Sequence, residues 1–131
     1  MKEYESTKII DIEAGYNFCI AVDSQGRLWS WGNNMYGQLG VGEIAETRIK
    51  PILIKEFNNT NDMKRDSDGK INTNAAIAKD KKIGRIACGS YHAACITQGY
   101  DVYTWGSNVH GQLGYPVTLE KDGKTPGRVT A

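Results

Sequence analysis

An internal duplication constrains the fold of this chain more than any other feature of its sequence. When the sequence is shifted by 74 positions, residues 8–40 align with residues 82–114 without a gap, and 11 of the 33 aligned pairs are identical. This indicates that one supersecondary unit is present twice. Units of this kind bury their apolar faces by stacking on each other. The identical residues of the first copy are Lys8, Ile9, Ile12, Gly15, Trp31, Gly32, Asn34, Gly37, Gln38, Leu39 and Gly40.

The similarity continues past the glycines, since each copy has a proline three residues before an aliphatic residue. Between the copies lies a polar stretch with few aromatic or β-branched residues, which predicts a long inserted loop. The expected organisation is a tail at 1–7, a first repeat at 8–54, the inserted loop at 55–81, a second repeat at 82–129 and a short end at 130–131.

The period of the apolar residues inside each repeat is two, which is typical of β-strands. Phe18, Ile20 and Val22 alternate with smaller or polar neighbours, and after the turn at 24–26 apolar groups occur on both faces of the next strand. A strand with two apolar faces belongs to a sheet that packs between other sheets. Fifteen glycines and three prolines suit the many tight turns that short strands need. The sequence therefore predicts an all-β fold.

The stretch from Gly15 to Gly32, followed by residues 33–42, resembles a repeat of the regulator of chromosome condensation family. Residues 89–114 are similar but differ in their turn, Gln98-Gly99-Tyr100-Asp101, where the glycine comes one position early. The resemblance implies a β-propeller in which each repeat supplies one four-stranded antiparallel blade. Two blades are incomplete as a propeller, because propellers close with about 4 to 8 blades.

The shared motif is expected to be structural. Its glycines suit positive φ or a close backbone approach, its two tryptophans suit the seams between blades, and its two glutamines suit hydrogen bonds to loop backbone. The motif residues are Gly15, Trp31, Gly32, Gly37, Gln38, Leu39, Gly40, Gly89, Trp105, Gly106, Gly111, Gln112, Leu113 and Gly114.

Net charge, apolar stretches and the number of cysteines indicate which partners and which cellular compartment to expect. Sixteen basic against 15 acidic residues leave a net charge of +1, which gives no long-range attraction for nucleic acid or an anionic membrane. No stretch approaches the roughly 18 apolar residues of a membrane span, and no apolar signal region follows the N-terminus. Three cysteines fit no disulfide framework, so reduced thiols in an intracellular setting are favoured.

His92 lies between Cys88 and Cys95, which raises the hypotheses of a metal site or of a thiol nucleophile with a neighbouring base. The duplication argues against both, because alanine occupies the position of every cysteine in the other copy and His92 aligns with Phe18. The odd separation of His92 and Cys95 also sends their side chains to opposite faces of a strand. We expect packing positions here, with no metal, no cofactor and no catalytic residue.

The run from Asp66 to Asn72 resembles a calcium loop, in which carboxylates at alternate positions precede a required glycine. With Gly69 as the sixth position, the first and twelfth positions fall on Lys64 and Ala75, and neither side chain binds a cation. A solvated loop is the better interpretation.

Two groups of residues are candidates for contact with a protein partner. Met, Tyr and His side chains on loops held by a rigid sheet suit such contacts, and a short basic cluster at the entrance to the second repeat suits an acidic partner. The loop group is Asn33, Met35, Tyr36, Asn108, Val109 and His110, and the basic cluster is Lys79, Lys81, Lys82 and Arg85.

The function that follows is a non-catalytic protein-protein interaction module, in which a propeller presents its loops to a partner. The alternative is guanine-nucleotide exchange on a small GTPase, which the resemblance also implies. The missing blades come either from the rest of a longer chain or from self-association, in which three copies of two blades make a six-bladed ring and four an eight-bladed one.

Overall fold

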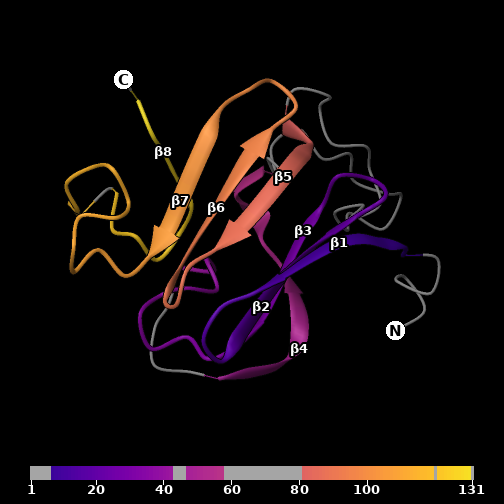
Figure 1. The fold of residues 1–131 in the computed structure, drawn as a ribbon, viewed down its shortest axis with the longest axis horizontal. Coiled ribbons are helices and arrows are strands. Elements are labelled where there is room, and N and C mark those ends of the chain that lie inside the picture. Colours follow the sequence, from indigo (N-terminus) through magenta and orange to yellow (C-terminus); the bar gives the residue numbers. More distant parts are fainter. Residues whose placement is uncertain (1–6, 43–46, 58–80, 120, 131) are drawn as a thin grey trace, which may run out of the picture.

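The computed structural model describes residues 7–42, 47–57, 81–119 and 121–130 and folds them into two four-stranded antiparallel sheets (Figure 1). Each sheet follows chain order, β1-β2-β3-β4 and β5-β6-β7-β8, as expected for two blades of a propeller. The strands are β1 Ile9–Ala14, β2 Phe18–Asp23, β3 Leu28–Gly32, β4 Arg48–Leu53, β5 Ile83–Cys88, β6 His92–Thr97, β7 Val102–Gly106 and β8 Gly127–Arg128.

The two sheets repeat each other down to their irregularities. The β1–β2 register shifts between Ile9 and Asp11, and the β5–β6 register shifts between Ile83 and Arg85, 74 residues later in each case. Bulges of this kind increase the local twist of a hairpin. The β1–β2 and β5–β6 hairpins therefore twist in the same way.

The β2–β3 turn is organised by one buried carboxylate. Asp23 accepts hydrogen bonds from the backbone N–H groups of Gln25 and Arg27 through Oδ1, and from Arg27 Nε and Trp29 Nε1 through Oδ2. Gly26 completes the turn with a φ of 81°. Because the Asp23 carboxylate bonds the backbone N–H groups of the turn, these groups are not available to continue the strand, and the chain reverses here.

The second copy makes the same turn without the glycine. Tyr100, at the position equivalent to Gly26, has a φ of 68°, and the Thr97 hydroxyl replaces the Asp23 carboxylate as acceptor of the Asp101 N–H. The early Gly99 therefore does not change the turn geometry, but a tyrosine now occupies the left-handed region at some energetic cost.

Both third strands end in glycine because a side chain has no room there. A Cβ on Gly32 or Gly106 would lie 2.5 Å from the carbonyl oxygen of Asn17 or Tyr91, and their φ angles are 110° and 104°. The loop that follows is tied back to its own sheet: Ser30 donates to the Leu39 carbonyl, and Thr104 donates to the Leu113 carbonyl.

The main core lies between the two sheets. Phe18, Ile20 and Val22 of β2 form one cluster with Ala93, Cys95 and Trp105 of the second sheet. Backbone bonds join the sheets at both ends of the strands, from the Tyr16 N–H to the Ser90 carbonyl and from the Ile83 N–H to the Gly26 carbonyl. The two sheets therefore share one apolar interface with backbone hydrogen bonds at its rim.

Part of the predicted insert is described, and its beginning is not a polar loop. Lys55–Phe57 form a short 3-10 helix, and Phe57 is buried, with its ring edge-on to Tyr103 at a centroid distance of 4.8 Å. The apolar ring drives this segment onto the core. The acidic run 66–72 and Lys79 lie outside the described residues.

Candidate protein-binding face

Four loops come together at one end of the two sheets (Figure 1). They are the β1–β2 turn at 15–17, the loop after β3, the β5–β6 turn at 89–91 and the loop after β7. Backbone bonds hold them side by side: the Asn33 N–H donates to Asn17, the Ser107 N–H to Tyr91 and the Tyr16 N–H to Ser90. We call this end the loop face.

Three tyrosines form an exposed aromatic cluster on the loop face. Tyr91 contacts Tyr16 edge-on at a centroid distance of 5.6 Å and Tyr36 at 4.9 Å with the rings tilted by 48°. The side chains remain 60%, 46% and 37% exposed for Tyr16, Tyr36 and Tyr91. We call these three residues the tyrosine cluster. It spans both sheets, since Tyr16 and Tyr36 come from the first repeat and Tyr91 from the second.

Of the loop residues that the sequence predicted, Tyr36 lies in this cluster and Met35 is exposed next to it in the chain. Val109 and His110 are exposed on the equivalent loop of the second sheet. The two asparagines differ, because Asn33 Oδ1 accepts from the Met35 N–H and Gln38 Nε2, and Asn108 bonds the Leu113 N–H and the Tyr115 carbonyl. Their amides hold the loops in shape.

Tyr16 and Tyr91 were missed by comparison of the two repeats. Tyr16 aligns with Ser90 and Tyr91 aligns with Asn17, so neither tyrosine is repeated and neither stands out in the alignment. The available signal was local: each tyrosine follows a motif glycine within two residues, in a turn where an aromatic side chain has no core to enter.

Four segments of the loop face contain no charged residue. Residues 15–17, 33–38, 89–91 and 107–112 contain no Asp, Glu, Lys or Arg, although 24% of the whole chain is charged. Tyr, Asn, Ser and Gly dominate these segments, as they do in antibody paratopes, where rigid aromatic rings supply contact area and small polar residues supply hydrogen bonds.

The basic cluster lies elsewhere, at the start of β5. Burial raises the pKa of the Glu56 carboxyl, and the positive charge of Lys81 offsets part of that increase. The Lys82 stem packs over Gly26, where an added Cβ would come within 2.6 Å of it. Arg85 is exposed on the outer face of the second sheet. The predicted partner-binding residues therefore divide between two separate regions.

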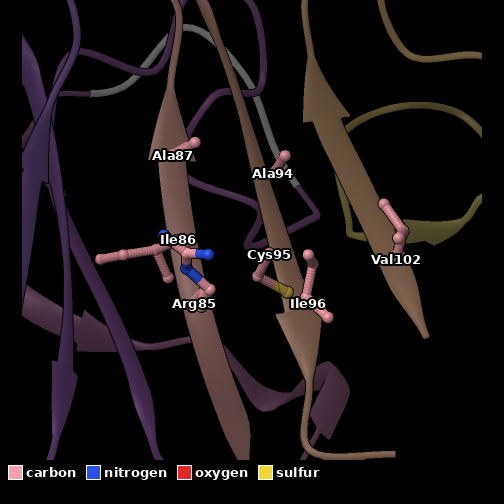
Figure 2. Close-up of a pocket in the computed structure, with 7 residues that line it drawn as sticks. All are labelled: Arg85, Ile86, Ala87, Ala94, Cys95, Ile96 and Val102. Atoms are coloured by element: carbon pink, nitrogen blue, oxygen red, sulfur yellow. The ribbon is translucent and has the colours of Figure 1, made fainter. Parts of the chain in front are cut away.

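Arg85 borders a mainly aliphatic hollow on the outer face of β5, β6 and β7 (Figure 2). The hollow has a volume of about 320 Å³. Its lining residues are Arg85, Ile86, Ala87, Ala94, Cys95, Ile96 and Val102.

The thiols have the properties of packing residues. Burial, followed by the charges of Glu13 and Cys19, raises the pKa of Cys88 to about 12, and burial raises that of Cys95 to about 12. A thiol that remains protonated at neutral pH is a poor nucleophile. Within the described ranges, no group of three His, Cys, Asp or Glu side chains is arranged to hold a metal ion.

In the part of the chain that the structure describes, none of the helices has the length and apolar character needed to cross a membrane.

Two family models, both described as the Regulator of chromosome condensation (RCC1) repeat, match the chain. One matches residues 9–38 and 85–112, and the other matches residues 25–65 and 101–131. Each model therefore finds the repeat twice.

Curated relatives are much longer than this chain. The human probable E3 ubiquitin-protein ligase HERC6 is 33% identical over 109 residues, covering 82% of this chain and 9% of the relative. Human RCC1 domain-containing protein 1 is 28% identical, with 89% and 26% covered, and the ultraviolet-B receptor UVR8 of Arabidopsis thaliana is 30% identical, with 87% and 21% covered.

Among solved structures, Prp20p of Saccharomyces cerevisiae superposes with a TM-score of 0.62 at 21% identity, over 92% of this chain and 26% of Prp20p. At this identity the similarity concerns the fold.

Proposed function

Because this chain belongs to the regulator of chromosome condensation repeat family, we propose that it is a non-catalytic module, within a larger propeller, whose loop face binds a protein partner. The observation that carries the proposal is the tyrosine cluster. Three large rings remain exposed on backbone that two packed sheets hold in place.

Tyrosine suits this role for a physical reason. Each ring buries a large area while only two torsion angles are fixed, so little conformational entropy is lost on binding. The rings of the tyrosine cluster already support each other, and their turns are tied together by backbone bonds. A partner therefore meets a preorganised surface.

The absence of charged residues from segments 15–17, 33–38, 89–91 and 107–112 also defines the contact. Rings and amides recognise a partner by apolar burial and hydrogen bonds, which salt screens far less than interactions between charges. We expect binding through the loop face to depend only weakly on ionic strength.

The basic cluster is not part of this proposal. Lys81 is close enough to Glu56 for its charge to act on that carboxyl, and the Lys82 stem packs against the first sheet. Both lysines therefore have contacts inside the molecule.

Guanine-nucleotide exchange remains the alternative function. The structure of Prp20p was determined together with its binding properties to Gsp1p and histones, which makes a small GTPase one class of partner to test. Release of labelled nucleotide from a panel of GTPases, with and without this chain, distinguishes exchange from binding alone.

The test of the main proposal uses selection of peptides from a random library on the immobilised full chain. The variant Y16S/Y36S/Y91S removes the tyrosine cluster, and the matched control Y100S removes a tyrosine that is 89% exposed in the β6–β7 turn. Peptides enriched by the wild type are expected to bind Y100S equally and to lose at least roughly tenfold in affinity for the triple variant. Equal binding to all three proteins contradicts the proposal.

A further inference from the structure

We propose, as a refinement of the function proposed above and dependent on it, that the partner segment bound by the tyrosine cluster is a proline-rich peptide in the polyproline II conformation. Such a segment is an extended left-handed helix with about three residues per turn and no internal hydrogen bonds. Its carbonyl groups and its proline rings are therefore free to contact a protein surface.

The tyrosine cluster lies where the two sheets meet, and both sheets that supply its rings are described. Tyr16 and Tyr36 come from the first repeat, Tyr91 comes from the second, and the Tyr16 N–H donates to the carbonyl of Ser90, next to Tyr91. The three side chains remain exposed with this junction fully formed. Their exposure is thus a property of the junction and not of an uncovered sheet.

The three rings form a row with Tyr91 in the middle. Its ring centroid lies 5.6 Å from that of Tyr16 and 4.9 Å from that of Tyr36, and no ring contact joins Tyr16 to Tyr36. Two residues of polyproline II span about 6 Å, which is close to each of these steps. A segment of about five residues therefore reaches across the whole row and packs its proline rings on the tyrosines.

The phenol hydroxyls of the tyrosine cluster are donors left for a partner. None of the three makes a hydrogen bond to a residue that the structure describes, whereas the Tyr115 hydroxyl donates to the Thr104 carbonyl at 2.7 Å inside the second sheet. A donor that a partner covers without offering an acceptor loses its bond to water at a cost. A polyproline II chain presents unbonded carbonyls, and proline adds no N–H that needs an acceptor in return.

Two other modes of peptide binding fit this face less well. A strand that extends a sheet needs free backbone groups along an edge, but the N–H groups of Tyr16, Asn33 and Ser107 already bond across the loops. A helix bonds its carbonyls internally and so leaves the tyrosine hydroxyls without acceptors. The four uncharged segments of the loop face also match a ligand that carries no charge.

The experiment titrates the isotope-labelled full chain with blocked decaproline and follows the tyrosine ring signals by NMR. The matched control is blocked decaproline made of D-proline, which has the same composition and forms a helix of the opposite hand. The ring signals of Tyr16, Tyr36 and Tyr91 are expected to shift with the L peptide, and the D peptide is expected to leave them unchanged.

Three variants locate the contact. Y16S/Y36S/Y91S is expected to bind the L peptide at least roughly tenfold more weakly. Y91F keeps the central ring and removes one hydroxyl, so it should lose about two- to tenfold. Y100S removes a tyrosine outside the loop face and should bind like the wild type. Circular dichroism checks that each variant is folded, and Y91S replaces the triple variant if that protein unfolds.

The peptides selected from the random library distinguish failure of this proposal from failure of the proposed function. Proline-rich peptides that need the tyrosine cluster support both. Peptides that need the cluster but lack proline, such as those with apolar residues at helical spacing, leave the loop face as a binding face and overturn the polyproline II partner. Equal response to the L and D peptides, or no response to decaproline at millimolar concentration, overturns it as well. Selected peptides that bind without the cluster contradict both.

Discussion

The indole N–H of Trp105 donates to the carbonyl oxygen of Gln38, 67 residues earlier in the chain, at 2.9 Å. This bond crosses the interface between the sheets, and Trp105 is completely buried. A tryptophan of the repeat motif therefore anchors the second sheet to the first through a loop of the same motif.

Replacement of Trp105 by Phe is expected to lower the free energy of unfolding by about 1–3 kcal/mol, because the Gln38 carbonyl loses its buried donor. Urea denaturation at low protein concentration measures the change. W31F, at the equivalent position on the outer face, is the control and should cost less than about 0.5 kcal/mol in the dilute chain. Equal losses in the two variants would contradict the assignment of Trp105 to the interface.

Replacement of Asp23 by Ala is expected to cost about 3–5 kcal/mol, since it breaks a buried ion pair with Arg27 and removes the acceptor of the hydrogen bonds that organise the turn. The matched comparison is D101A, which breaks the exposed pair between Asp101 and Arg128. That loss should be below about 1 kcal/mol, because solvent screens an exposed pair. Denaturant midpoints of the two variants test the difference.

Replacement of Tyr100 by Gly is expected to raise stability by about 0.5–1 kcal/mol. Glycine relieves the strain of a tyrosine in the left-handed region, and this gain exceeds the larger chain entropy that glycine loses on folding. At the equivalent position, replacement of Gly26 by Ala should destabilise the fold, because the added Cβ would come within 2.6 Å of Lys82. Thermal unfolding of both proteins gives the signs. A less stable Y100G would show that the Tyr100 side chain makes contacts that outweigh the strain.

The raised pKa values of Cys88 and Cys95 predict a loss of stability at alkaline pH. Burial raises the pKa of Cys88 and Cys95 from 9.0 to about 12, so the folded chain retains protons that the unfolded chain releases. Their contribution is complete below about pH 9 and is lost as the pH rises from there toward 12. The unfolding free energy of the wild type should therefore fall more steeply between these values than that of C88A/C95A, in which other titrating groups are unchanged.

Comparison of the repeats predicted the architecture well because both copies make the same local contacts. The glycines at 32, 37, 40, 106, 111 and 114 all adopt positive φ, as the motif indicated. Trp31 and Trp105, however, are identical in sequence and differ in burial, because burial depends on which neighbour is present. Local sequence specifies the surface of each sheet but not what covers it.

The tyrosine cluster lay beyond sequence-based prediction for a related reason. Tyr16, Tyr36 and Tyr91 come from three different turns, and only the packing of two sheets brings their rings within contact. Phe57 shows the same effect, since it belongs to a polar segment and yet packs on Tyr103. Whether a turn residue meets solvent or a partner ring depends on tertiary distances.

Each of the two repeats carries both halves of the sheet-to-sheet interface, the indole on one side and the glycine loop on the other. A gene that gains or loses one whole repeat therefore keeps every remaining junction intact, because each new neighbour brings the matching half. Gain or loss of part of a repeat breaks a junction instead. Selection can then change the number of units in steps without redesigning any contact, while the exposed turns diverge independently in each unit.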